Sequence, residues 1–427
     1  MNRLNFLSLF FLLITVSFVG CVNNSLENRF PSVENLPIID TLPDVLTIMN
    51  GEKITTVKEW EELRKPELAE LFQHYMYGYF PEYNETPKAV VESSTSIFDG
   101  KGTLNIVKIT PKEGGSSFSM LLVLPTNVEK PSIFIGLNFL GNHTVANFAE
   151  IPLPEVWINP EWAESDEPIA MDNQRGLRAD EWSLELIVER DYGVATIYAG
   201  EISPDYYGVE AEFDGCISGI QKEFLPAERC APIGSEWGQI AAWAWGIHRG
   251  VDYLVDNVEH DKIIVMGHSR LGKAALVAGA YDERIDIVIP SQSGCGGAAP
   301  SRTTVGEKLD NINPRFPFWF SETFKGFNDQ VEKLPFDQHC LIAIVAPRPL
   351  LLTNATDDQW TNPTGQFDML NEASKVYELY GKQGFNETEF PSEYELIGER
   401  MGYFIRPGGH STTGVEWNIW MDFCEKF

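Results

Sequence analysis

The residues best suited to chemistry lie in the segment IIVMGHSRLGKAAL. Ser269 follows an apolar run that predicts a buried strand, and it precedes residues with helical spacing. A serine at such a strand-to-helix turn is typical of a nucleophile elbow, in which a tight turn exposes the side-chain oxygen above a sheet. The backbone N–H groups that open the helix can then bind a developing oxyanion. The alternative is that Ser269 only caps the helix.

Two cationic residues follow on the first turn of the predicted helix. Arg270 comes directly after the serine, and Lys273 lies four residues after it, on the same helix face. Cations are unfavourable at a helix N-terminus, so we expect them to act on a polar acyl group or on an oxyanion rather than to be merely solvated. The segment also departs from G-x-S-x-G, because Leu271 occupies the second glycine position and Gly272 follows it. A generic lipase or carboxylesterase is therefore disfavoured.

A serine nucleophile requires a base, and histidine is the usual one. His410 lies in the glycine-rich segment PGGHS, between the last predicted strand and the last predicted helix, and is the candidate base. The segment LLLTNATDDQW offers the acid that would orient it. We expect Asp358 to be that acid and Asp357 to be the second candidate, although either could instead form an Asx turn. The order serine, acid, histidine is that of the α/β-hydrolases.

Three further histidines could lie near such a site. His268 adjoins the serine, and its side chain is expected to point away into packing. His143 follows an early strand, where contacts to an oxyanion or a substrate occur. His339 precedes an apolar run that we interpret as a buried strand, so it is expected to satisfy a local hydrogen bond, with a pocket role left open.

Apolar runs predict an alternation of short strands and helices along the chain. The expected strands cover residues 104–110, 118–124, 133–137, 192–198, 262–266, 285–289, 350–353 and 403–405. The expected helices lie within residues 56–80 and over 237–257, 269–280, 371–381 and 415–427. This pattern indicates a mostly parallel sheet covered by helices on both faces, the three-layer α/β-hydrolase sandwich. Residues 154–178 and 203–232 are expected to be long insertions that shape the substrate site.

The N-terminus carries targeting signals. Residues 1–20 resemble a signal peptide, and Gly20-Cys21 resembles a lipobox in which Cys21 becomes lipidated. Residues 21–45 are expected to be a tether, and residues 46–427 a catalytic domain. We expect an exported lipoprotein of the cell envelope, in the outer membrane or the periplasm. Plain secretion and an uncleaved anchor are the alternatives.

Charge and cysteine content limit the classes of function. The net charge of −30 argues against a nucleic-acid partner, because such binding depends on neutralising phosphates. Apart from Cys21, the cysteines show no metal-binding spacing, and most are expected to be isolated buried thiols. Cys216 and Cys230 form the pair most worth testing for a disulfide bond.

Taken together, these segments resemble the glucuronoyl esterases of carbohydrate esterase family 15 over roughly residues 55–427. The most specific match is G-x-S-R-x-G-K over residues 267–273. The others are SGCGGAA, GEKLDNINPRFPFWF, APRPL, DDQWTNP and GGH. The resemblance implies an α/β-hydrolase that cleaves esters between 4-O-methyl-glucuronic acid on xylan and lignin alcohols. It implies no metal and no organic cofactor, and we expect a monomer.

The resemblance also implies roles for individual residues. Ser269 is similar to the family's nucleophile, His410 to its base and Arg270 to its oxyanion-stabilising arginine. The glucuronate ring would be held by Lys273, Glu307 and Trp360.

The chain departs from the fungal members of that family in two places. Gln292 stands where they carry a glutamate, which favours Asp358 as the acid. His268 and Ser411 stand where they carry a pair of cysteines, so both halves of that bridge are missing here. Two rival functions remain: an acetyl xylan esterase or other carbohydrate acyl esterase on the same fold, and a non-catalytic glycan-binding lipoprotein.

Overall fold

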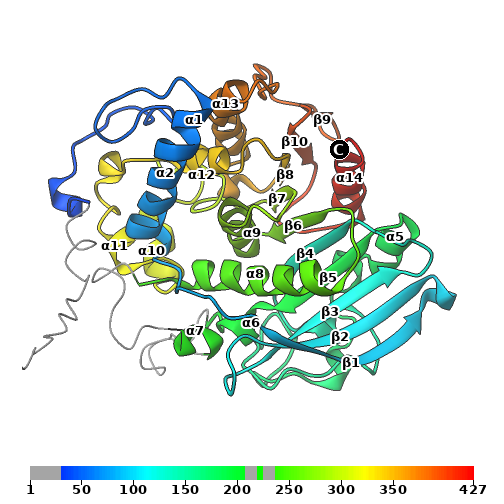
Figure 1. Ribbon diagram of the computed structural model, residues 1–427. Helices are drawn as coiled ribbons and strands as arrows, with labels where there is room; N and C mark the ends of the chain where they lie inside the picture. The colour runs from blue at the N-terminus through cyan, green and yellow to red at the C-terminus, as the bar shows by residue number, and fades with distance from the viewer. Residues whose placement is uncertain (1–29, 207–218, 225–235) are drawn as a thin grey trace, which may run out of the picture.

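The computed structural model describes residues 30–206, 219–224 and 236–427. Its strands form a single sheet in the order β1-β2-β3-β5-β4-β6-β7-β8-β10-β9 (Figure 1). The strands are β1 (Lys88–Ile97), β2 (Gly102–Thr110), β3 (Phe118–Pro125), β4 (Ile133–Asn138), β5 (Gly193–Tyr198), β6 (Ile263–His268), β7 (Ile287–Ser291), β8 (Leu350–Ala355), β9 (Leu396–Ile397) and β10 (Met401–Arg406).

The sheet has a parallel centre and antiparallel edges. Strands β5, β4, β6, β7, β8 and β10 run parallel to one another, whereas β1, β2 and β3 extend one edge and β9 closes the other in antiparallel pairing. The central strands are fully buried or nearly so, which explains why their apolar runs predict them. Strand β1 was not expected, because its sequence KAVVESSTSI is polar and mostly exposed.

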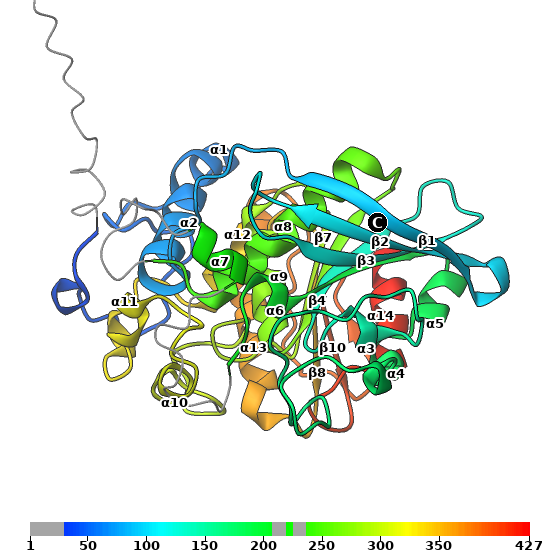
Figure 2. The same ribbon diagram turned by 90° about the horizontal axis from the view of Figure 1, so that it is seen from below.

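Helices cover both faces of the sheet, as Figure 2 shows from below. They are α1 (Val57–Glu59), α2 (Lys65–Phe72), α3 (Asn142–Val145), α4 (Ala179–Trp182), α5 (Leu184–Glu189), α6 (Ala199–Ile202), α7 (Gly219–Glu223), α8 (Gln239–Asn257), α9 (Arg270–Tyr281), α10 (Leu309–Arg315), α11 (Glu322–Lys325), α12 (Gln338–Ile344), α13 (Pro363–Leu379) and α14 (Gly414–Cys424). This is the predicted three-layer architecture.

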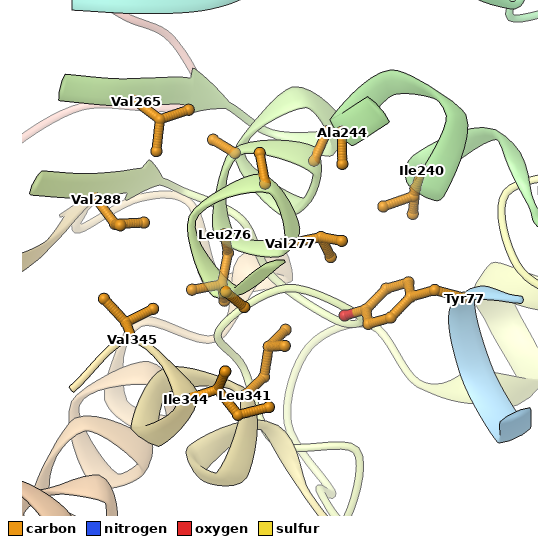
Figure 3. Packing of buried hydrophobic residues seen from close by; sticks show 14 of the residues in the cluster. Tyr77, Ile240, Ala244, Val265, Leu276, Val277, Val288, Leu341, Ile344 and Val345 are labelled. Carbon is orange, nitrogen blue, oxygen red and sulfur yellow. The ribbon is translucent and has the colours of Figure 1, made fainter. Parts of the chain in front are cut away.

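Side chains that alternate along β6 enter two different hydrophobic clusters, one on each face of the sheet. Ile263 and Val265 belong to the larger cluster, which contains residues of α8, α9, α12 and α13. Figure 3 shows part of this cluster, with Leu276 of α9 among side chains of β6, β7 and α12. Ile264 and Met266 face the other cluster, to which α5 and α14 contribute. The strand that leads to the serine is therefore fixed from both sides.

Two helices differ from their predicted extent. The helix expected over residues 371–381 is α13, which begins at Pro363 because the Asn362 side chain accepts a hydrogen bond from the Gly365 N–H (2.9 Å) and proline is favoured at the first helical position. The run after His339, expected to be a strand, is the helix α12. His339 lies inside that helix, and its Nε2 is 3.4 Å from Sγ of the adjacent Cys340, a local contact as expected, and 2.8 Å from the carbonyl oxygen of Pro43, a long-range one.

Packed structure begins before residue 46, the expected start of the domain. Val33 and Leu36 are buried in the larger core, and the Tyr75 hydroxyl donates to the carbonyl oxygen of Pro31 (2.6 Å). The predicted signal peptide and Cys21 lie outside the described residues. Within the described part of the chain, none of the helices combines the length and the apolar character needed to cross a membrane.

Three cysteines are free and buried, as expected for isolated thiols: Cys295, Cys340 and Cys424. Cys216 and Cys230, the candidate disulfide pair, lie outside the described residues.

Candidate active site

Ser269 occupies a sharp turn between β6 and α9. Its backbone is left-handed (φ 59°, ψ −128°), a strained conformation that is concentrated at functional sites, and its N–H donates to the carbonyl oxygen of Ser291 (3.0 Å). A Cβ at Gly267 would lie 2.2 Å from the Leu271 carbonyl oxygen, and a Cβ at Gly272 would lie 2.8 Å from that of Ser291. Both glycines are therefore required for the turn, which explains the shifted motif.

His410 and Asp358 lie in direct contact. Nδ1 of His410 is 2.6 Å from Oδ2 of Asp358, and the same carboxylate oxygen accepts a hydrogen bond from the Thr361 hydroxyl (2.9 Å). The Asp358 side chain is 5% exposed and that of His410 is 41% exposed. A carboxylate that accepts from Nδ1–H keeps Nε2 available to take a proton. Asp357 is exposed, and its backbone N–H donates a hydrogen bond to the Gly408 carbonyl oxygen (3.0 Å).

A hydrogen-bond network fixes the loop that carries His410. Arg406 donates to the carbonyl oxygens of Ser411 (2.7 Å) and Gly409 (3.4 Å), and it forms a buried ion pair with Glu416. Gln292, at the position of the fungal glutamate, donates from Nε2 to the Ser411 carbonyl (2.7 Å). Gln292 thus contacts the loop of the base and not the imidazole. Sequence analysis did not single out Arg406 or Glu416, because their pairing depends on the fold.

The expectation for His268 is wrong. Its side chain does not point away from the site but lines the same cavity as Ser269 and His410, and its ring centroid is 4.4 Å from that of His410. Burial holds the pKa of His268 well below its usual value, and the positive charges of Arg406 and Arg270 act in the same direction. His268 is therefore a neutral neighbour of the base.

Arg270 is held in place by an acidic residue and by aromatic rings. Its Nη1 is 2.5 Å from Oδ2 of Asp205, and its guanidinium carbon lies 4.7 Å and 4.6 Å from the ring centroids of Trp162 and Trp319. Asp205 also accepts a hydrogen bond from Nε1 of Trp319 (3.0 Å). Trp162 and Asp205 lie in the two segments predicted to be long insertions near the substrate site. Nothing else in the sequence indicated that either residue contacts Arg270.

The three residues assigned to the sugar ring lie on different parts of the chain: Lys273 on α9, Glu307 before α10 and Trp360 after β8. Lys273 is buried, and its Nζ donates to the carbonyl oxygen of Ser293 (2.5 Å). Burial lowers the pKa of Lys273, whereas the charge of Glu307 opposes that shift. The backbone N–H of Glu307 donates to the Trp360 carbonyl (2.9 Å), and the Trp360 side chain is 49% exposed. An exposed indole next to buried charges can stack on a sugar and bind its hydroxyls.

His143 is part of the packed interior. It is fully buried, its Nε2 lies 3.3 Å from Oε1 of Gln174, and burial lowers its pKa. His143 is not among the residues that line the cavity at the serine.

A cavity of about 250 Å³ opens beside the serine. Its lining residues are Ser269, Arg270, His268 and His410, the apolar and aromatic Phe139, Leu140, Trp162 and Trp182, and the polar Asn138, Thr144, Arg178 and Glu181. Lys273, Glu307 and Trp360 are not among its lining residues. Ser269 therefore lines a cavity whose walls combine aromatic and polar side chains.

Comparison with known proteins identifies the family. A family model described as glucuronyl esterase of fungi matches residues 232–381. Carbohydrate esterase MZ0003 of an unknown prokaryotic organism is 38% identical over 393 residues, covering 90% of this chain and 89% of that protein. A solved promiscuous CE15 esterase from a marine bacterial metagenome is 37% identical with a TM-score of 0.84, covering 92% of this chain and 98% of that one. The chain belongs to carbohydrate esterase family 15.

A second solved member supports the same assignment. The glucuronoyl esterase from Solibacter usitatus is 36% identical with a TM-score of 0.82, and the match covers 92% of this chain and 99% of that one. The family 15 chain is thus a carboxylic ester hydrolase of the glucuronoyl esterase family, and its α/β-hydrolase fold is confirmed.

Proposed function

We propose that the protein cleaves esters of glucuronic acid, including its 4-O-methyl form, on xylan, and that it does so with Ser269, His410 and Asp358. These esters are the linkages between lignin and carbohydrate. The observation that carries the proposal is the 2.6 Å contact between Nδ1 of His410 and Oδ2 of Asp358, together with the cavity that His410 and Ser269 both line. A nucleophile, a base and an oriented acid in this order perform acyl transfer.

The mechanism proceeds in two halves. His410 accepts the proton of Ser269 as Oγ attacks the ester carbonyl at C6 of the glucuronate. The backbone N–H of Arg270 and its guanidinium, held by Asp205, stabilise the oxyanion. His410 then gives its proton to the leaving alcohol, and a water molecule activated by His410 releases glucuronate from the serine. The negative charge of Asp358 stabilises the imidazolium in both halves.

The polar residues beside the serine support a sugar acid as the acyl part. Lys273 and Glu307 offer a buried cation and a buried carboxylate for ring hydroxyls, and the exposed Trp360 ring offers an apolar face for the sugar. A simple acetyl group would use none of them. Acetyl esters are nevertheless a second candidate substrate, because a family member with 37% identity is described as promiscuous.

The test compares benzyl glucuronate with p-nitrophenyl acetate, using the wild type and Ser269→Ala side by side. We expect the wild type to prefer the glucuronate ester strongly and Ser269→Ala to lose both activities by several orders of magnitude. Hydrolysis of acetate alone would favour the acetyl esterase, and inactivity on both esters would favour the glycan-binding alternative. Wild-type activity in Ser269→Ala would exclude Ser269 as the nucleophile.

A further inference from the structure

A second cavity, of about 460 Å³, shares no lining residue with the cavity at Ser269. Residues of β1, β2, β3, α3 and α6 line it, together with the start of the first predicted insertion. We propose that this second cavity binds an uncharged segment of the xylan main chain. The inference deepens the proposed function and rests on it, because xylan is then the polymer that carries the ester.

Glu201 of α6 gives the second cavity a carboxyl whose hydrogen-bonding capacity is largely unused. In the described part of the chain its one hydrogen bond comes from the Ser119 N–H, 3.1 Å from Oε2, although a carboxylate has about four acceptor positions. Burial raises the pKa of Glu201 to about 7, and the Ser119 N–H and the charge of Lys108 oppose that shift only in part. Glu201 is partly exposed, so hydroxyl groups in the cavity can reach the remaining positions.

Hydrogen-bond donors lie around the same cavity. The hydroxyl of Ser119 has no hydrogen-bond partner among the described residues, and Ser119 is partly exposed. The Lys108 ammonium lies 3.8 Å from Oε1 of Glu92, and both side chains are about half exposed, so Lys108 can donate to a second group. Sugar hydroxyls both donate and accept, and a carboxyl, a hydroxyl and an ammonium therefore suit them.

The second cavity also offers apolar contacts. Leu153, Pro154 and Val156 line it and are half-buried. Such side chains can pack against the C–H face of a pyranose ring, and ligand sites usually combine apolar walls with a few polar groups. The volume of about 460 Å³ lies within the roughly 300–1,000 Å³ of pockets that enclose a small ligand.

The charge of the lining favours an uncharged sugar over an acidic one. Glu92, Glu155 and Glu201 are its acidic residues, and Lys108 is the one basic residue among the described residues that line it. An excess of carboxylates repels uronates and phosphates. The buried cation Lys273, by contrast, suits the acidic branch of the polymer. The two sites thus match the two parts of glucuronoxylan, its uncharged main chain and its acidic side group.

Hydrogen bonds connect the second cavity to the active site. Asn142 donates from Nδ2 to the Ser119 carbonyl oxygen (2.8 Å), and its Oδ1 accepts from Nδ2 of Asn138 (2.7 Å). Ser119 and Asn142 line the second cavity, whereas Asn138 lines the cavity at Ser269. Three residues in direct contact therefore span the distance between the two cavities, so one polymer chain can reach both.

The experiment titrates xylotetraose, which has neither a uronate nor an ester, into the protein and measures its affinity by isothermal titration calorimetry. We expect saturable binding to the wild type. Glu201→Ala should weaken it about tenfold or more, because a hydrogen bond to a charged group contributes a factor of that size. Leu153→Ala, which removes only apolar contact, should weaken it about three- to tenfold. Both variants should keep the wild-type kcat/KM on benzyl glucuronate, which contains no xylose.

Two further variants serve as controls. Glu185→Ala removes an exposed glutamate of α5 that does not line the cavity, and its affinity for xylotetraose should equal that of the wild type. Trp360→Ala should also bind xylotetraose like the wild type, because Trp360 is assigned to the glucuronate ring and is not part of the second cavity.

Three results would overturn this inference while the proposed function stands. They are the absence of saturable binding to the wild type, wild-type affinity in both Glu201→Ala and Leu153→Ala, and loss of binding in Trp360→Ala alone, which would place the xylose chain at the glucuronate site. Failure of the wild type to hydrolyse benzyl glucuronate would instead overturn the proposed function.

Discussion

Arg406 and Glu416 form an ion pair that joins the two ends of the loop carrying His410. Arg406 is the last residue of β10, Glu416 lies in the first turn of α14, and their side chains are 6% and 1% exposed. Glu416 also accepts a hydrogen bond from the Thr413 N–H (2.9 Å), so each partner holds a different part of the loop. The position of the base is thus linked to a buried ion pair that does not touch the substrate.

Replacing Arg406 with lysine should impair catalysis more than folding. Lysine keeps the charge but cannot reproduce the fork of donors that binds Glu416 and the loop carbonyls. We expect kcat for benzyl glucuronate to fall about 10- to 100-fold with a smaller change in KM, because small displacements of a catalytic group have effects of this size. Arg190→Lys is the control, since Arg190 pairs with Asp422 and Glu425 on the surface. A folded Arg406→Lys protein with wild-type kcat would contradict the prediction.

The two neighbouring aspartates provide a matched pair of variants. Asp358→Asn should reduce kcat about 10⁴-fold, because an amide no longer holds the correct tautomer of His410. Asp357→Asn should stay close to the wild type, since the Asp357 side chain is exposed. Steady-state kinetics on benzyl glucuronate distinguish the two, and a larger loss in Asp357→Asn would make that residue the acid.

Lys273→Met tests the sugar side of the site. Deleting a hydrogen bond from a charged donor should lower kcat/KM for benzyl glucuronate about 10- to 100-fold. The rate on p-nitrophenyl acetate should change much less, because that substrate has no sugar hydroxyls. Equal losses on both esters would show that Lys273 only supports the fold around Ser293.

His268 should make the protein less stable in acid. Its folded pKa lies well below 6.5, chiefly through burial, whereas the unfolded chain binds a proton near that pH. The contribution of His268 to the free energy of unfolding is fully present above about pH 6.5. It is lost as the pH falls, because the unfolded state then binds more protons than the folded state. In His268→Gln, the urea midpoint should fall less between about pH 7.5 and about pH 5 than in the wild type. An equal fall in both proteins would count against a buried neutral His268.

Export as a lipoprotein is a proposal that rests on residues 1–21. If Cys21 carries the lipid, Cys21→Ser should move the protein from the membrane fraction to the soluble fraction of cells that express the full chain. Immunoblotting of the two fractions measures this. A wild-type protein that is already soluble would favour plain secretion.

The sequence predicted the centre of the fold better than its edges. The central strands are apolar because both faces are covered, whereas β1 is polar and β9 has only two residues, so neither has a recognisable pattern. The start of α13 was missed because Asn362 caps it through a side-chain hydrogen bond that no apolar spacing reveals.

Within the site, residues close to the serine in sequence were found, and residues brought there by the fold were missed. Asp205 acts through a contact with Arg270, which is distant in sequence, and Arg406 acts through a pair with Glu416 that forms only when the loop between β10 and α14 folds back; spacing patterns encode neither contact. The direction of His268 could have been predicted, because strand alternation places it on the same face as Ile264 and Met266. That face is covered by α14, from whose N-terminal loop His410 reaches the site.

The hydrogen bonds and the ion pair that hold the His410 loop also determine how the loop responds to redox conditions. Ser411 and His268 supply no sulfur where the fungal enzymes have a bridge, and the loop is fastened by Arg406, Glu416 and Gln292 instead. These contacts are non-covalent, so thiol reductants do not break them and their formation needs no oxidant. The catalytic loop can therefore assemble and keep its shape in reducing surroundings as well as in oxidising ones.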